Sequence, residues 1–436
     1  MQKNPWRFQL EMVRIGELIH ELGKRNHMAP TLKRPLEGIR VTGLEQYMAG
    51  PYCTMLLADA GAEVIKIERP GVGDPRRSMP PFAEKDGKKK AAGFMGYNRN
   101  KKSLALNLRD PKGQEIFKLL TAESDVVVEN LRPGSMSKMG LGQKDMRALH
   151  PKLIWATISG FGRNEDYRGP YSDRPAFDIV AESMSGIMNL VGFADKPPSW
   201  TIYGMADVYS GQVTAYGIMQ ALFMRERTGE GQFVDSAMFD NMLALNESMI
   251  ALHSVSGQNP QRGVFKNLWP RGAYQTKDGY IALNVPDNII WGRLCEAMGH
   301  PELATDERAN SGTARSANVD FLQPFLEGWL GTISRNEAVD TLNGMGVPCG
   351  PINDAEDVAN DPHVKARGSI MDIEDPDVGT YGFARSVPML SSAPELRADP
   401  SPNLGQHSRE ILENLLGVSP DDVTSLAEQK VIQTTD

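Results

Sequence analysis

The chain has 436 residues and a formal net charge of −8, and 40% of its residues are hydrophobic and 23% charged. This length and composition are typical of a globular protein with a sizeable core. An acidic balance argues against a nucleic-acid partner, because neutralising phosphates requires a basic face. The three cysteines lie far apart and form no CxxC pair, which argues against a disulfide framework and a zinc site and favours a reducing, cytoplasmic compartment.

Residues 1–34 are expected to form a helical N-terminal extension, because they lack an apolar signal core and their apolar residues recur at helical spacing. The longest strongly apolar stretch, VTAYGIMQALFM at 213–224, is shorter than the roughly 20 residues that cross a bilayer. No membrane partner is therefore expected.

Alternating strands and helices follow. IRVTGLE predicts a strand, PYCTMLLADAG a helix that Pro51 opens and Gly61 ends, and EVIKIE a second strand, which together make a parallel βαβ unit. KSLALNL, DVVVEN and PKLIWATISGFG continue the pattern. The expected fold class is α/β, with a large, doubly wound, Rossmann-like domain. The turn GLEQYMAGP lacks GxGxxG, so a nicotinamide or flavin site loses its main support.

From Asp178 to about Ile250 the pattern is mainly helical, and one expected helix starts at Val234. AYQTKDGYIALNV then predicts a hairpin with Asp-Gly at its tip, followed by amphipathic helices, so a smaller α+β domain is expected there. The run EKDGKKK at 84–90 is interpreted as a solvated loop. The segment SPNLGQHSREILENLLG at 401–417 is expected to begin as a Pro-rich stretch and to end as a helix.

The sequence lacks the motifs that are typical of metal sites and hydrolases. The seven histidines are scattered, and the sequence holds no HExxH, no GxSxG and no P-loop. No metal site is expected. The remaining candidate for a catalytic residue is Asp178 in RPAFDIVAESMSG. By local rules its carboxylate is a good helix N-cap, and the same carboxylate could also take part in catalysis.

Two basic clusters accompany this carboxylate. IKIERPGVGDPRR places Lys66, Arg69, Arg76 and Arg77 at the end of an expected strand, and NRNKKS places Arg99, Lys101 and Lys102 before another. Ligands of doubly wound sheets bind outside the carboxyl ends of strands, and arginine suits phosphate. The clusters are consistent with a polyphosphorylated small ligand or with solubilising surface charge, and spacing alone does not decide.

Several segments in order resemble the class III CoA-transferase family, the formyl-CoA transferase or CaiB/BaiF type. They are PLEGIRVTGLEQYMAGPYCTMLLADAGAEVIKIERPGVGD, NRNKKSLALNLRDPKG, DVVVENLRPGSMSKMGLG, PAFDIVAESMSGIM, RTGEGQFVDSAMFD, YQTKDGYIALNV, GVPCGPINDAEDVANDPHVKARG and LGQHSREIL. The resemblance covers the chain from Pro35 to roughly Leu415.

The resemblance implies an enzyme in which Asp178 attacks an acyl-CoA thioester, giving a mixed anhydride and then an aspartyl-CoA thioester. Coenzyme A thioester is then a substrate, with no permanently bound cofactor. The resemblance also implies an interlocked homodimer, with a large CoA-binding domain from residues 35–235 and 361–436 and a small domain with its linker at 236–360.

The CoA-binding residues that the resemblance implies lie in four segments. They are Gln46, Tyr47, Met48 and Ala49 near the thiol end, and Arg69, Asn98, Lys101, Lys102 and Lys138 near the phosphates. Met48 stands where formyl-CoA transferase has glutamine, and GQNPQRGVFKNLWPRG replaces its polyglycine flap. These departures favour a larger carboxylic or dicarboxylic acid, with succinyl-CoA as donor and Arg262 and Arg271 as candidate contacts to the acid.

Two alternatives stay open. A 2-methylacyl-CoA racemase or a CoA-ester isomerase of the same superfamily would transfer a proton, but the racemases carry histidine before the motif aspartate, and here Phe177 cannot act as acid or base. A non-catalytic CoA-binding protein, in which Asp178 only caps a helix, is the other.

Overall fold

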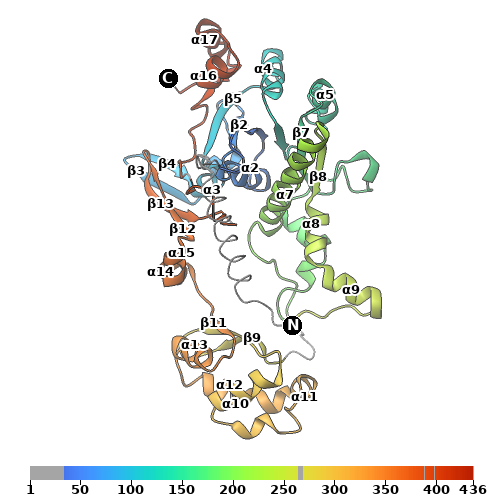
Figure 1. The fold of residues 1–436 in the computed structure, drawn as a ribbon, viewed down its shortest axis with the longest axis vertical. Helices are drawn as coiled ribbons and strands as arrows, with labels where there is room; N and C mark the ends of the chain where they lie inside the picture. The colour runs from blue at the N-terminus through green and yellow to red at the C-terminus, as the bar shows by residue number, and fades with distance from the viewer. Residues whose placement is uncertain (1–33, 264–268, 387, 397, 436) are drawn as a thin grey trace, which may run out of the picture. The chain divides into compact units, whose positions relative to one another are not determined.

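The computed structural model describes residues 34–263, 269–386, 388–396 and 398–435, so residues 1–33 of the expected N-terminal extension lie outside the described residues. The chain forms two units (Figure 1). The first comprises the described residues of Met1–Asp178, Ala206–Asn241 and Asp372–Asp436, and the second comprises Ile179–Met205 and the described residues of Met242–Met371. The chain therefore leaves the first unit and returns to it twice.

A seven-stranded sheet forms the centre of the first unit, in the order β14-β5-β2-β1-β6-β7-β8. All its neighbouring strands pair in parallel except β14, which runs antiparallel to β5 at one edge. The strands are β1 Arg40–Leu44, β2 Glu63–Glu68, β5 Lys101–Leu106, β6 Val126–Glu129, β7 Ile154–Ser159, β8 Phe233–Ala237 and β14 Ile432–Gln433. This sheet confirms the expected α/β class with a large parallel sheet.

The strand order reverses between β1 and β6. Val41 of β1 is aligned with Val64 of β2 on one side and with Val126 of β6 on the other. From β1 the chain builds outward through β2 and β5, and it then returns to place β6, β7 and β8 on the opposite side. In open α/β sheets, ligands bind at the carboxyl ends of the strands where this reversal occurs.

Local sequence signals set the ends of the helices beside the sheet. Asp110 accepts a hydrogen bond from the Lys112 backbone N–H, and Pro111 occupies the first helical position of α4, where its missing N–H is harmless. The helices that lie wholly or largely in this unit are α2 Ala49–Asp59, α3 Ala92–Asn98, α4 Pro111–Ala122, α5 Gln143–Leu149, α7 Met205–Thr228, α16 Ser408–Glu410 and α17 Pro420–Glu428. α6 Asp178–Met184 and α8 Met238–Leu245 continue from the first unit into the second.

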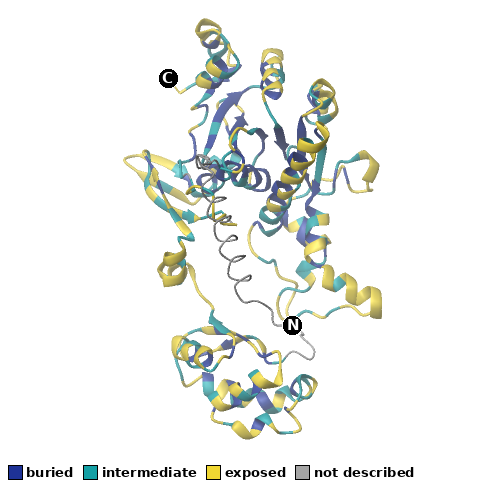
Figure 2. Cartoon of the chain, viewed as in Figure 1, coloured by how far each residue is buried: buried dark blue, intermediate teal, exposed yellow. Residues whose placement is uncertain are grey.

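The core of the first unit unites early and late parts of the chain. The central strands are buried, as the dark blue ribbon in Figure 2 shows, and all residues of β6 and β7 are buried. Phe117 of α4 and Trp155 of β7 belong to one apolar cluster with Leu412 and Ile432 from the last 30 or so residues. Burial of these apolar side chains is therefore what holds the C-terminal segment in the first unit.

One short strand, β8, stands where the sequence predicted the start of a helix. The helix expected from Val234 is wrong at its start, because residues 233–237 form β8, in which Phe233 is aligned with Trp155 of β7. Five residues fit a helix or a strand pattern equally well, so the pairing with β7 decides. α8 then begins at Met238.

The run EKDGKKK is a β-hairpin and not an irregular loop. Asp86 and Gly87 have φ angles of 51° and 77°, which an Asp-Gly turn adopts readily, and they join β3 Phe82–Lys85 to β4 Lys88–Ala91. Lys90 pairs with Asp375 and Asp377, at 2.8 and 3.0 Å. Asp375 is the last residue of β12 Ile370–Asp375, and Asp377 lies in the turn that joins β12 to β13 Gly379–Ala384. Pairing with distant acids, together with the Asp-Gly turn, explains the hairpin.

The second unit contains the expected hairpin. β9 Arg271–Gln275 and β10 Tyr280–Asn284 are antiparallel on either side of Asp278-Gly279, and β11 Cys349–Pro351 adds a third antiparallel strand. The helices of this unit are α9 Glu247–Ser256, α10 Asn288–Ala297, α11 Gly312–Ala317, α12 Val319–Leu330, α13 Arg335–Gly344, α14 Ala355–Asn360 and α15 Pro362–Arg367. Its own apolar core, with Trp291 and Leu326, packs helices on the sheet.

Membrane spans and metal clusters are absent from the part of the chain that the structure describes. No helix there is both long and apolar enough to cross a bilayer. No group of three or more His, Cys, Asp or Glu side chains in the same residues is arranged to hold a metal ion. Cys53, Cys295 and Cys349 are all free thiols.

Candidate active site

Asp178 is anchored at the N-terminal end of α7. Its Oδ1 accepts the backbone N–H of Ala206 at 2.6 Å and that of Asp207 at 3.1 Å. The N–H groups of a first helical turn have no partner within the helix, and anions are stabilised at this end of a helix. Asp178 is 7% exposed. The structure thus holds one carboxylate of the first unit in a fixed position, with little contact with solvent.

This anchoring answers part of the question that the sequence left open. The local pattern predicted that Asp178 caps the helix that follows it, and α6 does begin at Asp178. The bonds to Ala206 and Asp207, however, reach a helix 28 and 29 residues further along the chain. Capping a distant helix fixes the carboxylate relative to the rest of the first unit, which a local cap alone would not do.

A second carboxyl group, that of Asp207, belongs to the first turn of α7, which binds Asp178. Burial, and then the charge of Asp178, raise the pKa of Asp207 to about 7, while the nearby Arg76 acts in the opposite direction. Asp207 therefore changes its protonation state near neutral pH, next to an acid whose backbone anchor it provides.

The loop after β1 lies at the reversal point of the strand order. The Gln46 backbone N–H donates to Asn130 Oδ1, and Asn130 Nδ2 donates back to the Gln46 carbonyl, both at 2.8 Å. Asn130 directly follows β6, so these two bonds join the carboxyl ends of β1 and β6. The next residue, Tyr47, donates its N–H to Asp74 Oδ1 at 3.2 Å and has a positive φ of 63°.

The same loop contacts α7 one turn after Asp207. Met48 is buried, and Ala49 is the first residue of α2. A Cβ added to Gly211 of α7 would stand 2.7 Å from the carbonyl oxygen of Ala49, which real Cβ atoms do not tolerate. Glycine at 211 therefore allows α2 to begin directly against α7. Since Asp178 binds the first turn of that helix, the loop and the carboxylate share one end of α7.

Two cavities open at the carboxyl ends of β1, β2 and β5, with volumes of about 330 and about 650 Å³. Arg69, Asn107 and Arg109 line both of them. The smaller cavity is also lined by Leu44, Gln46, Ile67, Glu68, Leu106, Leu108, Leu131, Ser135 and Met139, and the larger one by Pro70, Gly71, Ala427, Lys430, Ile432, Gln433 and Thr434. The cavities therefore extend from the reversal point, at Gln46, to a basic wall.

This geometry suits an elongated anionic ligand. The guanidinium groups of arginine bind phosphate oxygens through a fixed fork of donors, and lysine adds a point charge. Arg69 and Arg109 supply the first kind of contact and Lys430 the second. A ligand with phosphates at this wall would point its other end toward Gln46 and the start of α2.

Comparison with known proteins decides the family. A model of CoA-transferase family III matches residues 36–408. The chain belongs to CoA-transferase family III. It is 39% identical to the succinyl-CoA–D-citramalate CoA-transferase of Chloroflexus aurantiacus over 402 residues, 92% of this chain and 98% of that protein. It is 35% identical to the succinyl-CoA:glutarate CoA-transferase of Mus musculus, over 92% of this chain and 91% of that protein.

Solved structures agree with this assignment. A CaiB/BaiF family protein from Brucella suis has a TM-score of 0.79 and 36% identity, covering 88% of this chain and 100% of that one. Rv3272 from Mycobacterium tuberculosis has a TM-score of 0.76 and 30% identity, covering 87% of this chain and 99% of that one. The expectations that the chain resembles class III CoA-transferases and is an enzyme of that family are confirmed.

The remaining CoA contacts that the family resemblance implied fall into two groups. Lys138 is exposed in a short 3-10 helix, Ser137–Met139, and Met139 lines the smaller cavity at the carboxyl edge of the sheet. Lys138 thus directly precedes a residue that lines the same cavity as Arg69. In the second group, Lys101 and Lys102 are the first two residues of β5, at its amino end, and Asn98 is the last residue of α3.

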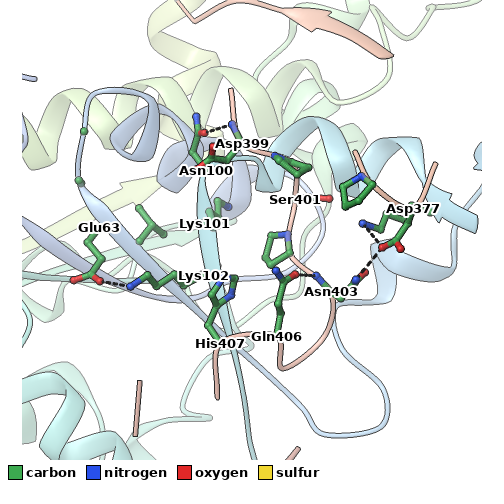
Figure 3. Close-up of a pocket in the computed structure, with 17 residues that line it drawn as sticks. Glu63, Asn100, Lys101, Lys102, Asp377, Asp399, Ser401, Asn403, Gln406 and His407 are labelled. Atoms are coloured by element: carbon green, nitrogen blue, oxygen red, sulfur yellow. Dashed lines mark hydrogen bonds and ion pairs between the residues drawn. The ribbon is translucent and has the colours of Figure 1, made fainter. Parts of the chain in front are cut away.

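The side chains of Lys101 and Lys102 face acids, and that of Lys101 reaches Glu45, the residue directly after β1. Lys101 Nζ is fully buried, 3.2 Å from Glu45 Oε1 and 2.9 Å from Asn98 Oδ1. Burial lowers the pKa of Lys101 to about 8. Lys102 Nζ lies 2.8 Å from Glu63 and 2.7 Å from Glu410. Both lysines border a third cavity, of about 480 Å³, at the amino ends of β2 and β5 (Figure 3). Their assignment to CoA phosphates stays a prediction.

Two other basic residues of the first cluster also turn inward. Lys66 is buried and its Nζ lies 2.9 Å from Asp74 Oδ2 and 2.7 Å from the Glu45 carbonyl oxygen. Arg77 forms a double ion pair with Glu68, at 2.7 Å for each bond. These two cations stabilise buried acids of the first unit. Of the other two members of the cluster, Arg69 lines the cavities, and Arg76 lies close enough to Asp207 to oppose the rise of its pKa.

Arg262 and Arg271, the candidate contacts to the acid, belong to the second unit. Arg262 donates to three backbone carbonyls, those of Phe193 at 3.0 Å, Asn189 at 3.4 Å and Lys196 at 2.6 Å. These bonds hold the backbone of residues 189–196 in place. Arg271 is exposed at the start of β9. Their roles toward a substrate stay predictions.

Among the cavity residues that could contact an anionic ligand, Asn107, Arg109 and Lys430 were not predicted from the sequence. Asn107 and Arg109 directly follow β5, so the rule that ligands bind at the carboxyl ends of strands could have found them. Lys430 offers no such signal. It precedes β14 near the end of the chain and reaches the cavity only because β14 pairs with β5.

Proposed function

We propose that this protein transfers CoA from succinyl-CoA to a second carboxylic acid, with Asp178 as the covalent nucleophile. The observation that carries the proposal is the anchoring of the Asp178 carboxylate by α7, at the same end of that helix as the Gln46 loop and its cavity. A nucleophile must be held close to the carbonyl carbon that it attacks, and this position is fixed by two backbone bonds.

The transfer takes place in four balanced steps. An Asp178 oxygen attacks the thioester carbonyl carbon, the C–S bond breaks, and a mixed anhydride and CoA thiolate result. The thiolate then attacks the Asp178 carbonyl carbon and releases succinate, leaving an aspartyl-CoA thioester. A carboxylate of the acceptor attacks this thioester and expels the thiolate. The thiolate finally attacks the acceptor's carbonyl in the second anhydride and frees Asp178.

For the donor, we propose that Arg69 and Arg109 bind the phosphates of CoA and that Lys138 and Lys430 add charge at the same edge of the sheet. Gln46, Tyr47, Met48 and Ala49 then surround the thiol end. Arginine side chains in a cavity at the strand reversal support this placement.

The names of the relatives support the choice of substrates. The Chloroflexus aurantiacus relative is a succinyl-CoA–D-citramalate CoA-transferase, and the mouse relative is a succinyl-CoA:glutarate CoA-transferase. A third relative, from Haloarcula hispanica, is a succinyl-CoA:mesaconate CoA-transferase. It is 37% identical to this chain, over 87% of this chain and 96% of that protein. Their donor is the same while their acceptors differ. We therefore propose succinyl-CoA as the donor and a dicarboxylic acid as the acceptor.

A donor and acceptor screen tests this function. The protein is mixed with succinyl-CoA and, in turn, citramalate, mesaconate, glutarate and malate, and new CoA thioesters are measured by mass spectrometry. We expect one acceptor to be converted well above the others, and Asp178→Asn, which keeps an oxygen for the α7 N–H groups, to convert none. Transfer by Asp178→Asn at the wild-type rate would contradict the role of Asp178.

We further propose that the protein is a homodimer. Large apolar side chains of α7 and α9, among them Phe223 and Val255, are well exposed, and Tyr216 and Met219 line an apolar groove of about 440 Å³ in the first unit. An interlocked dimer would cover such surfaces. Sedimentation equilibrium should give twice the chain mass, and a monomer at micromolar concentration would contradict this proposal.

Proton transfer on a CoA ester is a second candidate function, favoured by Asp207. A carboxyl whose pKa is about 7 can accept and return a proton near neutral pH. Incubating a 2-methylacyl-CoA in deuterated water without an acceptor acid separates the two functions. Deuterium at the α-carbon, lost in Asp207→Asn, would favour this candidate, and absence of exchange together with acceptor-dependent transfer would favour the first.

A further inference from the structure

Tyr47 has an unusual backbone conformation. Four non-glycine residues in the described ranges have a positive φ, and they are Tyr47, Asp86, Asn100 and Lys430. Asn and Asp enter this region with least difficulty, because their short polar side chains bond locally, whereas a tyrosine there is strained. Such strain persists only where the surroundings enforce it, and it is concentrated at functional sites.

The surroundings of Tyr47 enforce its conformation from both sides. Gln46 is fixed by the two bonds to Asn130, and the Tyr47 N–H is fixed by Asp74 Oδ1. Asp74 is itself buried and is held by Lys66 Nζ at 2.9 Å, at the centre of the ionic cluster of the first unit. The conformation of Tyr47 is thus built into the core and is not a property of a loose loop.

The ring of Tyr47 packs on the residue before the proposed nucleophile. The Tyr47 and Phe177 ring centroids lie 6.2 Å apart with an interplanar angle of 86°, an edge-to-face contact. Both rings stay outside the core, since Tyr47 is 38% and Phe177 is 67% exposed. Core packing therefore does not explain why a tyrosine occupies this position, which glycine would fill without strain.

The proposed reaction supplies a reason for an apolar wall here. A mixed anhydride on Asp178 reacts with water: the water oxygen attacks an anhydride carbonyl carbon, the bridging C–O bond breaks, and free succinate and the Asp178 carboxylate are formed. One proton of that water ends on the CoA thiolate and the other is released with the new carboxylate. Succinyl-CoA is then hydrolysed to succinate and CoA, and no transfer occurs, unless the site excludes water.

We propose that Tyr47 and Phe177 form a water-excluding wall beside Asp178 and that the strained conformation of Tyr47 exists to place its ring there. The proposal rests on the acylation of Asp178 put forward above. It gives Tyr47 a role in protecting the covalent intermediate, beyond a contact with the thiol end of CoA.

The chain offers a clean variant for the test. Tyr47→Gly removes the ring and at the same time relieves the positive φ, so the fold is not penalised by the backbone. Phe177→Leu removes the partner ring and keeps an apolar side chain. Tyr167→Ala, which removes a ring that is 84% exposed in the 3-10 helix Glu165–Tyr167, is the matched control.

The measurement is the ratio of succinyl-CoA hydrolysis to CoA transfer in water labelled with oxygen-18, with the KM for succinyl-CoA and the Asp178 adduct followed in parallel. We expect this ratio to rise roughly tenfold or more in Tyr47→Gly and Phe177→Leu and to stay unchanged in Tyr167→Ala. If the wild type forms an Asp178 adduct but the ratio of hydrolysis to transfer is unchanged in both variants, the water-excluding role of Tyr47 and Phe177 is wrong, while the proposed mechanism stands.

Two further outcomes are equally decisive. A rise in the KM for succinyl-CoA without added hydrolysis would show that Tyr47 only binds the thioester, and the inference would fail. No adduct at Asp178 in a wild type that transfers CoA would overturn the proposed mechanism, and the inference with it.

Discussion

Asp178 binds the first turn of α7 through Asp207: the backbone N–H of Asp207 donates to Asp178 Oδ1 at 3.1 Å, while the side chain of Asp207 adds a second carboxyl to the site. Burial and then the charge of Asp178 raise the pKa of that carboxyl to about 7. One residue thus stabilises the proposed nucleophile through its backbone and responds to its charge through its side chain.

The raised pKa of Asp207 predicts a pH-dependent stability. Its ordinary value is 3.8, so between pH 3.8 and about 7 the folded state binds more protons than the unfolded state, and stability falls as the pH rises through this window. At about 1.4 kcal/mol per pH unit, the effect reaches a few kcal/mol. Asp207→Asn should therefore be more stable than the wild type at pH 8 and about equal to it at pH 4, by urea unfolding.

A charge-matched control belongs to this test. Asp195→Asn removes the same charge at a side chain that is 75% exposed and should change the free energy of unfolding little, because exposed charges contribute little to stability. If the difference between Asp207→Asn and the wild type is the same at pH 4 and pH 8, the raised pKa of Asp207 is wrong.

Removing the arginines of the cavity wall should weaken the binding of the CoA thioester. Arg69→Ala and Arg109→Ala should each raise the KM for succinyl-CoA by about tenfold, the equivalent of one charge-assisted hydrogen bond, with little change in kcat. Added salt should diminish the difference from the wild type, because it screens the phosphate contacts. Initial rates at two ionic strengths measure both effects.

Lys102→Ala is the informative comparison. The Lys102 ammonium pairs with Glu63 and Glu410 at the amino end of β5, so this variant should leave the KM within about twofold of the wild type. A KM that rises in Lys102→Ala as much as in Arg69→Ala would favour the sequence-based assignment of Lys102 to the CoA phosphates.

Gly211 should tolerate no side chain. A Cβ there would stand 2.7 Å from the Ala49 carbonyl oxygen, so Gly211→Ala must push α2 away from α7 at a cost of roughly 1–3 kcal/mol and should also lower kcat. Gly328→Ala in α12 meets nothing within 4 Å and should gain roughly 0.5–1 kcal/mol. Thermal melts of both variants measure the contrast, and a Gly211→Ala as stable as Gly328→Ala would contradict the close packing.

The sequence predicted those elements whose signals are local. The Pro51 and Gly61 boundaries, the Asp110-Pro111 start of α4 and the Asp278-Gly279 turn identify α2, α4 and the β9–β10 hairpin within a few residues. β8 was mistaken for a helix because its pairing with β7 joins residues far apart in the chain. The Asp86-Gly87 turn carried a hairpin signal that the surrounding lysines obscured.

The site shows the same division. Asp178 was predicted from its motif, but its anchor lies in α7, and no local pattern reports a cap from 28 residues away. Arg69 was found at the end of β2, whereas Lys430 reaches the same cavity through the pairing of β14 with β5. The spacing of the basic residues could not predict that the Lys101 side chain would pair with the buried Glu45, because this pairing depends on which face of β5 is turned toward Glu45.

The most direct test of the account is chemical trapping at Asp178. The protein is incubated with succinyl-CoA without an acceptor acid, quenched with hydroxylamine, digested and analysed by peptide mass spectrometry, with Asp178→Asn in parallel. The account predicts a hydroxamate at Asp178 in the wild type and none in the variant. Transfer at the full rate, with Asp178 unmodified under every quench condition, would contradict it.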